Sequence, residues 1–174
     1  PRIYALFVLV AVMGAGTGMP LGAQPPTPFD TNSWGVDTGY YLLDDNAWWP
    51  EAMVSGDFDH DGRPDVAVAN WGNFVTTAPR VSVLLADGNG RWSAPSHLVT
   101  PTLANGIACA DLDGDAHLDL VVTDSGLFQE GTTISVLRGN GDGTFAAPTS
   151  YAVGAEGPTD VELADVTGDG LLDV

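Results

Sequence analysis

An aspartate-rich nonapeptide occurs three times in this chain, at residues 57–65, 111–119 and 165–173, and successive copies begin 54 residues apart. A fixed period of this length indicates that one supersecondary unit is repeated along the chain. Repeated units bury their apolar faces against their neighbours, so the period restricts the chain to stacked repeat architectures. The unit built around the nonapeptide therefore decides the fold.

Short segments of small and β-prone residues flank the nonapeptides and predict strands. They precede the three copies at 52–55, 106–109 and 160–163, and follow the first two at 66–69 and 120–123. A loop between two strands differs from an EF-hand loop, which ends in a bidentate Glu at its twelfth position. The twelfth positions here are Val68 and Val122, which excludes the EF-hand.

The second half of each unit is predicted to contain a strand, a tight turn and a last strand. The glycines of the turns suit the positive φ of a hairpin, so a turn is preferred there to a second metal site. The proline near the end of each last strand suits an outer edge, where no ladder donor is needed. These segments are, in order, 81–85, 87–90 and 91–95 in the first unit, and 134–137, 139–143 and 144–148 in the second.

Four antiparallel strands repeated about every 54 residues predict an all-β fold, a β-propeller of four-stranded blades. A β-solenoid is the alternative, although its repeats are usually shorter. The third copy of the nonapeptide is followed by one residue, Val174. We therefore expect about two and a half repeats, and a chain that is a fragment of a longer protein.

The spacing of the carboxylates within each nonapeptide indicates a metal site. Aspartates at alternate positions of a short loop repel one another unless they share a cation. A hard dication such as Ca²⁺ takes several oxygen ligands of this kind. Each nonapeptide is therefore interpreted as a calcium loop.

The loops, the strands after them and the segment Gly139-Asn140-Gly141-Asp142-Gly143-Thr144-Phe145-Ala146-Ala147-Pro148 resemble the FG-GAP/VCBS repeats of integrin-alpha-type β-propellers. The resemblance covers about residues 46–174, divided into 46–99, 100–153 and the incomplete 154–174. It implies a partial propeller with up to three Ca²⁺, bound by side chains at loop positions one, three, five and nine and by the backbone carbonyl at position seven. The implied ligands are Asp57, Asp59, Asp61, Arg63 and Asp65; Asp111, Asp113, Asp115, His117 and Asp119; and Asp165, Thr167, Asp169, Leu171 and Asp173.

Two residues depart from that pattern. Ala116 stands at position six, where the other loops have glycine and where positive φ would strain a Cβ. Thr167 offers a neutral hydroxyl at position three, where the other loops offer a carboxylate. The first loop is therefore expected to be the strongest site.

Composition and the N-terminal segment indicate an exported protein. Asp and Glu number 23 against 5 Lys and Arg, a net charge of −18, which excludes nucleic acid and anionic membranes as favoured partners. The apolar run 3–13 is too short to span a bilayer, so residues 1–23 are predicted to be a signal peptide, with an uncleaved anchor as the alternative. Residues 24–45 are then a linker and lead-in strand. After signal cleavage no membrane insertion is expected, and the mature chain would be secreted, periplasmic or at the cell surface.

The long connections are expected at the end of the blades opposite the calcium loops, and they are the expected place for a partner. Trp71 is interpreted either as an aromatic platform for a glycan or protein or as a cover for an open edge. Trp48 and Trp49 are assigned to the cover. The residues predicted to lie on the binding face are Asn70, Trp71, Asp124 and Phe128.

No nucleophile motif or phosphate-binding loop is present, and His60, His97 and His117 occupy unrelated positions of the repeat. The lone Cys109 lies in an apolar run and is expected to be a buried small hydrophobe. Catalysis is therefore not favoured. The leading hypothesis is an exported calcium-binding module for adhesion, glycan binding or protein interaction. The alternative is part of a secreted polysaccharide-degrading enzyme.

Overall fold

The computed structural model describes residues 50–71, 80–88, 92–101, 103–126 and 131–174. The predicted signal peptide and linker, and the residues Trp48, Trp49 and Phe128, lie outside the described residues. These residues form β-strands and no helix, and they therefore contain no membrane-spanning helix.

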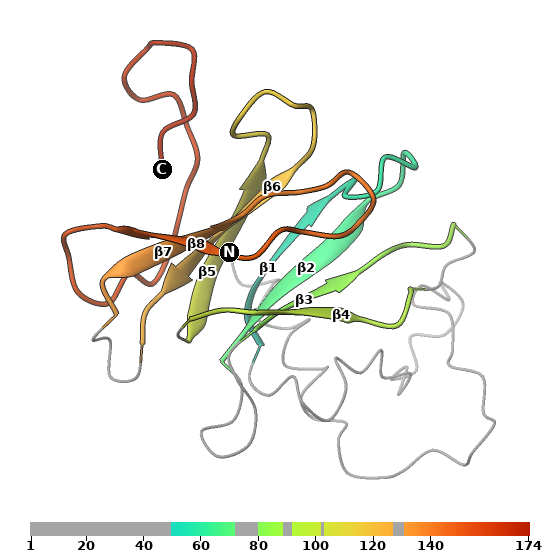
Figure 1. The fold of residues 1–174 in the computed structure, drawn as a ribbon, viewed down its shortest axis with the longest axis horizontal. Coiled ribbons are helices and arrows are strands. Elements are labelled where there is room, and N and C mark those ends of the chain that lie inside the picture. The colour runs from blue at the N-terminus through green and yellow to red at the C-terminus, as the bar shows by residue number, and fades with distance from the viewer. Residues whose placement is uncertain (1–49, 72–79, 89–91, 102, 127–130) are drawn as a thin grey trace, which may run out of the picture.

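Eight strands form two antiparallel sheets of four, each in chain order (Figure 1). Each sheet is called a blade below. Blade 1 contains β1 (Pro50–Gly56), β2 (Asp65–Asn70), β3 (Arg80–Leu84) and β4 (Ser96–Val99). Blade 2 contains β5 (Ala104–Ala110), β6 (Asp119–Asp124), β7 (Thr133–Leu137) and β8 (Thr149–Ala152). The all-β prediction is confirmed, and the two sheets are blades of a partial propeller.

The two blades have the same internal register. β1 has an irregularity between Pro50 and Ala52, and β5 has one between Ala104 and Ile107, which begins at the equivalent position of the repeat. Side chains alternate between the two faces of a strand, so one repeated pattern gives both blades the same pair of faces.

The main core lies between the blades, where β5 packs against β1 and β2 (Figure 1). Blade 1 contributes small and β-branched side chains from β2 and β3, and blade 2 contributes larger ones from β6 and β7. Each face is apolar because the facing blade removes it from water. The buried residues are Phe58, Ala67, Ala69, Val81, Val83, Ala104, Ile107, Leu120, Val122 and Leu137.

The other face of blade 2 is covered by the third repeat. Val121, Ile134 and Val136 are buried there, and Val161 and Leu163 pack against them. The strand predicted at 160–163 does not form, because a strand needs a paired neighbour. The third repeat instead has one isolated bridge, between Ala164 and Asp173.

The sequence prediction placed the last strand of each unit one segment too early in the chain. β4 and β8 begin directly after Pro95 and Pro148, not before them. Trp92 and Phe145, the second residues of the predicted segments, each form only an isolated bridge in the connection between two strands. Phe145 packs edge-on against Phe58, with ring centroids 5.6 Å apart, so it is a packing residue as expected. The prolines precede the edge strands because a residue without an N–H cannot donate to the ladder.

Candidate metal centre

The first two acidic loops connect the first and second strands of their blades, at the upper side of Figure 1. Residues 57–65 join β1 to β2, and residues 111–119 join β5 to β6. The third loop, 165–173, is closed by hydrogen bonds between the backbones of Ala164 and Asp173 at 2.9 and 3.2 Å. The loops therefore recur at the same place in each repeat.

Each loop turns through positive φ at its fourth and sixth positions. Glycine occupies both in the third loop, with φ of 79° at Gly168 and 86° at Gly170. His60 takes φ of 59° at position four of the first loop. Ala116 takes φ of 71° at position six of the second loop, where positive φ was predicted to strain its Cβ. A Cβ is disfavoured in this region, so the loop conformation outweighs the preference of two of its residues.

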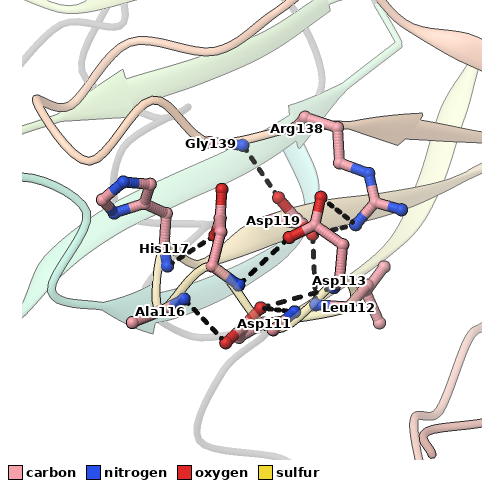
Figure 2. A network of polar contacts seen from close by, with 10 residues as sticks. Asp111, Leu112, Asp113, Ala116, His117, Asp119, Arg138 and Gly139 are labelled. Atoms are coloured by element: carbon pink, nitrogen blue, oxygen red, sulfur yellow. Dashed lines mark hydrogen bonds and ion pairs between the residues drawn. The ribbon is translucent and has the colours of Figure 1, made fainter.

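The turns bring the carboxylates of positions one, three and five together in two loops. In the first loop the oxygens of Asp57, Asp59 and Asp61 lie within 4.8 Å of one another. In the second loop the same holds for Asp111, Asp113 and Asp115. Figure 2 shows Asp111 and Asp113 of this loop. Thr167 takes the middle place in the third loop, which leaves Asp165 and Asp169 as its carboxylates at these positions.

Position one organises the loop backbone. Asp57 Oδ2, Asp111 Oδ2 and Asp165 Oδ2 each accept the backbone N–H of position six, at 3.0, 2.9 and 2.9 Å. The N–H of Gly114 holds the pKa of Asp111 below its ordinary value, and the N–H of Gly170 does so for Asp165. Hydrogen bonds to the charged form favour it, so these two side chains are ionised over a wider pH range.

Position seven is tied to position five in every loop. The backbone N–H groups of Arg63, His117 and Leu171 donate to the carboxylates of Asp61, Asp115 and Asp169, at 2.9, 2.8 and 2.9 Å. This bond holds the peptide that joins positions six and seven. The role of the three carbonyls as metal ligands stays a prediction.

In the first two loops position nine is buried and fastens the loop to its blade. Asp65 accepts the N–H of Phe58 at 2.9 Å and that of Ala86 at 2.8 Å. Burial raises the pKa of Asp65, the two hydrogen bonds lower it, and the charges of Asp59 and Asp61 raise it. Asp119 likewise accepts the N–H groups of Leu112 and Gly139, at 3.1 and 2.9 Å (Figure 2). Neither residue belongs to the two clusters of three carboxylates, and the role of position nine as a metal ligand stays a prediction.

Arginines partly neutralise the two loops. Arg63 pairs with Asp61, and its Nε donates to the carbonyl of Ala86 at 3.1 Å. Arg138 pairs with Asp119 and lies 3.4 Å from Asp113 (Figure 2). Each loop nevertheless has more carboxylates than paired cations among the described residues.

The donor set fits Ca²⁺. Three carboxylates in each of the first two loops offer hard oxygen ligands within one coordination shell of each other, and all three in each loop are half-buried or exposed. The third loop has fewer charges, since Thr167 offers a hydroxyl. The first two loops are therefore the better candidates.

The predicted binding-face residues are not gathered into one exposed surface. Asn70 and Asp124 end β2 and β6 and are fully buried, which corrects their placement on exposed loops. Asn70 donates to Ser82 Oγ at 3.0 Å, and Asp124 accepts the Ser135 hydroxyl at 2.8 Å. Both are polar because they bridge neighbouring strands inside the sheet. Trp71 is half-buried, and its indole N–H donates to Asn105 Oδ1 at 3.1 Å.

Two side-chain environments differ from the prediction, those of the His60–His117 pair and of Cys109. His60 Nε2 is 2.8 Å from His117 Nδ1, although the sequence predicted no histidine cluster. The two occupy different positions of the repeat, and only the packing of blades brings such positions together. Cys109 is half-buried against the main core rather than fully buried, and burial raises the pKa of its thiol.

A family model for FG-GAP-like repeats matches residues 57–122 and 124–174, which is more than half of the chain. No curated protein and no solved structure matches it. The match covers all three acidic loops and the strands between them.

Proposed function

Because the chain belongs to the FG-GAP-like repeat family, we propose that it is a calcium-binding propeller module of an exported protein that recognises a glycan or a protein partner. Export rests on the apolar run 3–13 and the small residues after it. Metal binding and recognition then belong to opposite ends of the blades. The acidic loops bind the metal, and the connections between β2 and β3 and between β6 and β7 take part in recognition.

One observation carries the calcium part of the proposal. The same three loop positions bring carboxylate oxygens within 4.8 Å of one another in two successive repeats. Exposed acidic groups repel at such distances, and the effect is largest where the loop backbone holds them in place. A bound dication relieves the repulsion and gains several oxygen ligands.

The recognition part rests on Trp71 and on the charge of the chain. Its ring follows β2 directly and is half-buried, so part of it remains accessible at the end of the sheet. An aromatic ring with an exposed face suits stacking against a sugar or an apolar side chain. The net charge of −18 disfavours anionic ligands and favours neutral or basic ones.

Isothermal titration with Ca²⁺ tests the metal assignment loop by loop. We expect Asp57→Asn and Asp111→Asn each to remove binding at their own loop, because each removes a carboxylate from one cluster. Glu156→Gln, which removes one exposed charge outside the loops, is the matched control and should leave the titration unchanged. Unchanged titration of both loop variants would overturn the assignment.

A further inference from the structure

His60 and His117 bring two imidazole rings together across the boundary between the blades. His60 lies in the β1–β2 loop of blade 1, and His117 lies in the β5–β6 loop of blade 2. The distance from His60 Nε2 to His117 Nδ1 is 2.8 Å, and the ring centroids are 4.9 Å apart with 66° between the ring planes. With no ion bound, the two nitrogens share a hydrogen bond, and the tautomers of the rings decide which one donates.

The surroundings hold His117 in this position. A Cβ built on Gly141 would lie 2.3 Å from His117 Nδ1, so the imidazole rests on a place that only glycine leaves open. The backbone N–H of His117 is bonded to Asp115. The ring is thus fixed between the acidic loop of blade 2 and the turn that follows β7.

The local charge favours a cation at this boundary. His60 lies between Asp59 and Asp61 in the chain. The exposed carboxylate of Asp142 is close enough to His117 for an electrostatic interaction. Carboxylates on both sides of a histidine pair attract a metal ion. Of the described residues, none adds a third histidine, cysteine or carboxylate ligand within the same short range as the pair.

The distance between the two nitrogens discriminates between metals. Metal–nitrogen bonds of about 2.0–2.1 Å put two cis ligands of a tetragonal ion about 2.9 Å apart, and two ligands of a tetrahedral ion about 3.3 Å apart. The observed 2.8 Å is nearer the first value. Imidazole nitrogen also suits Cu²⁺ and Ni²⁺, whereas Ca²⁺ takes oxygen.

We propose that His60 and His117 form a second metal site, distinct from the calcium loops, which takes a divalent transition metal of the Cu²⁺ or Ni²⁺ kind through His60 Nε2 and His117 Nδ1. Water completes the coordination on the exposed side. Since the two ligands come from neighbouring blades, the bound ion also cross-links blade 1 to blade 2.

The test is a titration of the full chain with Cu²⁺ in saturating Ca²⁺, read by electron paramagnetic resonance and by calorimetry. The wild type should bind one Cu²⁺ with hyperfine coupling from two nitrogens. His60→Asn and His117→Gln should each leave at most one nitrogen and weaken binding at least tenfold. Asn suits the positive φ of residue 60, so that variant keeps the loop conformation.

His97→Gln is the matched control, because His97 lies on β4 and contacts Ser82 instead of the pair. It should retain the two-nitrogen signal. A melting curve in Ca²⁺ shows whether each variant folds. If only one of His60→Asn and His117→Gln folds, that variant alone is enough to test the site. A two-nitrogen signal of unchanged affinity in His60→Asn or His117→Gln, or its loss in His97→Gln, would overturn the proposal. An oxygen-only spectrum in the wild type would overturn it as well.

Discussion

Asp65 Oδ1 accepts the backbone N–H of Ala86 at 2.8 Å, which fastens the end of the first acidic loop to the turn after β3. The bond is repeated in blade 2, where Asp119 accepts the N–H of Gly139 at 2.9 Å. In each blade, one buried carboxylate thus connects the β1–β2 or β5–β6 loop to the turn beside it. These hydrogen bonds hold each loop to its own blade without a metal ion.

Asp65→Ala should destabilise the chain even without calcium. It leaves the N–H groups of Phe58 and Ala86 without their partner, and a buried unsatisfied donor costs about 1–3 kcal/mol. We expect the free energy of unfolding in urea, measured in a chelator, to fall by about 2 kcal/mol. Asp59→Ala is the control, since it removes a carboxylate from the cluster and should cost little under the same conditions. Equal losses in the two variants would contradict the role of position nine.

Asp124→Asn should stabilise the chain at neutral pH. Burial raises the pKa of Asp124, while the hydroxyls of Ser135 and Thr133 lower it, and its Oδ1 has no partner among the described residues. When the pKa of an acid is higher in the folded state than in the unfolded state, the free energy of unfolding of the protein falls as the pH rises from the unfolded pKa through the folded pKa. The equivalent residue of blade 1, Asn70, is already neutral.

Urea denaturation at pH 7 and near pH 4 checks this prediction. The gain from Asp124→Asn should be about 1 kcal/mol at pH 7 and should shrink toward pH 4, where the wild-type carboxyl is protonated. Asp160→Asn, at an exposed position, is the control. A loss of stability of the same size at both pH values would show that Asp124 is needed as a carboxylate.

Ala116→Gly should stabilise the second loop. Ala116 has φ of 71°, a conformation that costs an L-residue with a Cβ about 1–2 kcal/mol and costs glycine little. The greater flexibility of glycine in the unfolded chain offsets part of the gain, which leaves about 0.5–1 kcal/mol. Ala146→Gly, at an exposed position outside the positive-φ set, should lower stability slightly. Chemical denaturation of both variants in Ca²⁺ measures the difference, and a loss in Ala116→Gly would refute it.

Trp71→Ala and Trp71→Phe separate recognition from blade packing. If an aromatic ring stacks on the partner, the alanine variant should weaken binding by about 2 kcal/mol, or roughly thirtyfold, and the phenylalanine variant should retain most of it. Asn105→Ala removes only the hydrogen bond to the indole. Binding on a glycan array or to a captured protein partner is the measurement. Equal binding by all variants would remove Trp71 from the interface.

The strands beside the acidic loops were predictable because the 54-residue period and the β-prone segments agree. Residues 52–55, 66–69, 106–109 and 120–123 all lie within observed strands. The shared end of loops and turns also followed from the meander, and the Asp65 to Ala86 bond confirms it.

Other features depend on contacts that a linear pattern does not contain. Pro95 and Pro148 fit either end of an edge strand, so their position could not fix where β4 and β8 begin. Asn70 and Asp124 resemble loop residues, but each faces a serine on the next strand inside its sheet. A repeat alignment compares equivalent positions, whereas neighbouring blades bring unlike positions such as those of His60 and His117 into contact.

Thermal unfolding in millimolar Ca²⁺ and in a chelator is the most direct measurement of calcium binding by the acidic loops. A cation that binds only the folded chain stabilises it by RT ln(1 + [L]/Kd), which is about 2.7 kcal/mol at 100 times Kd. We expect a higher melting temperature in Ca²⁺ for the wild type and for Glu156→Gln, and a smaller increase for Asp57→Asn. Identical wild-type melting curves in Ca²⁺ and in chelator would contradict calcium binding by the acidic loops.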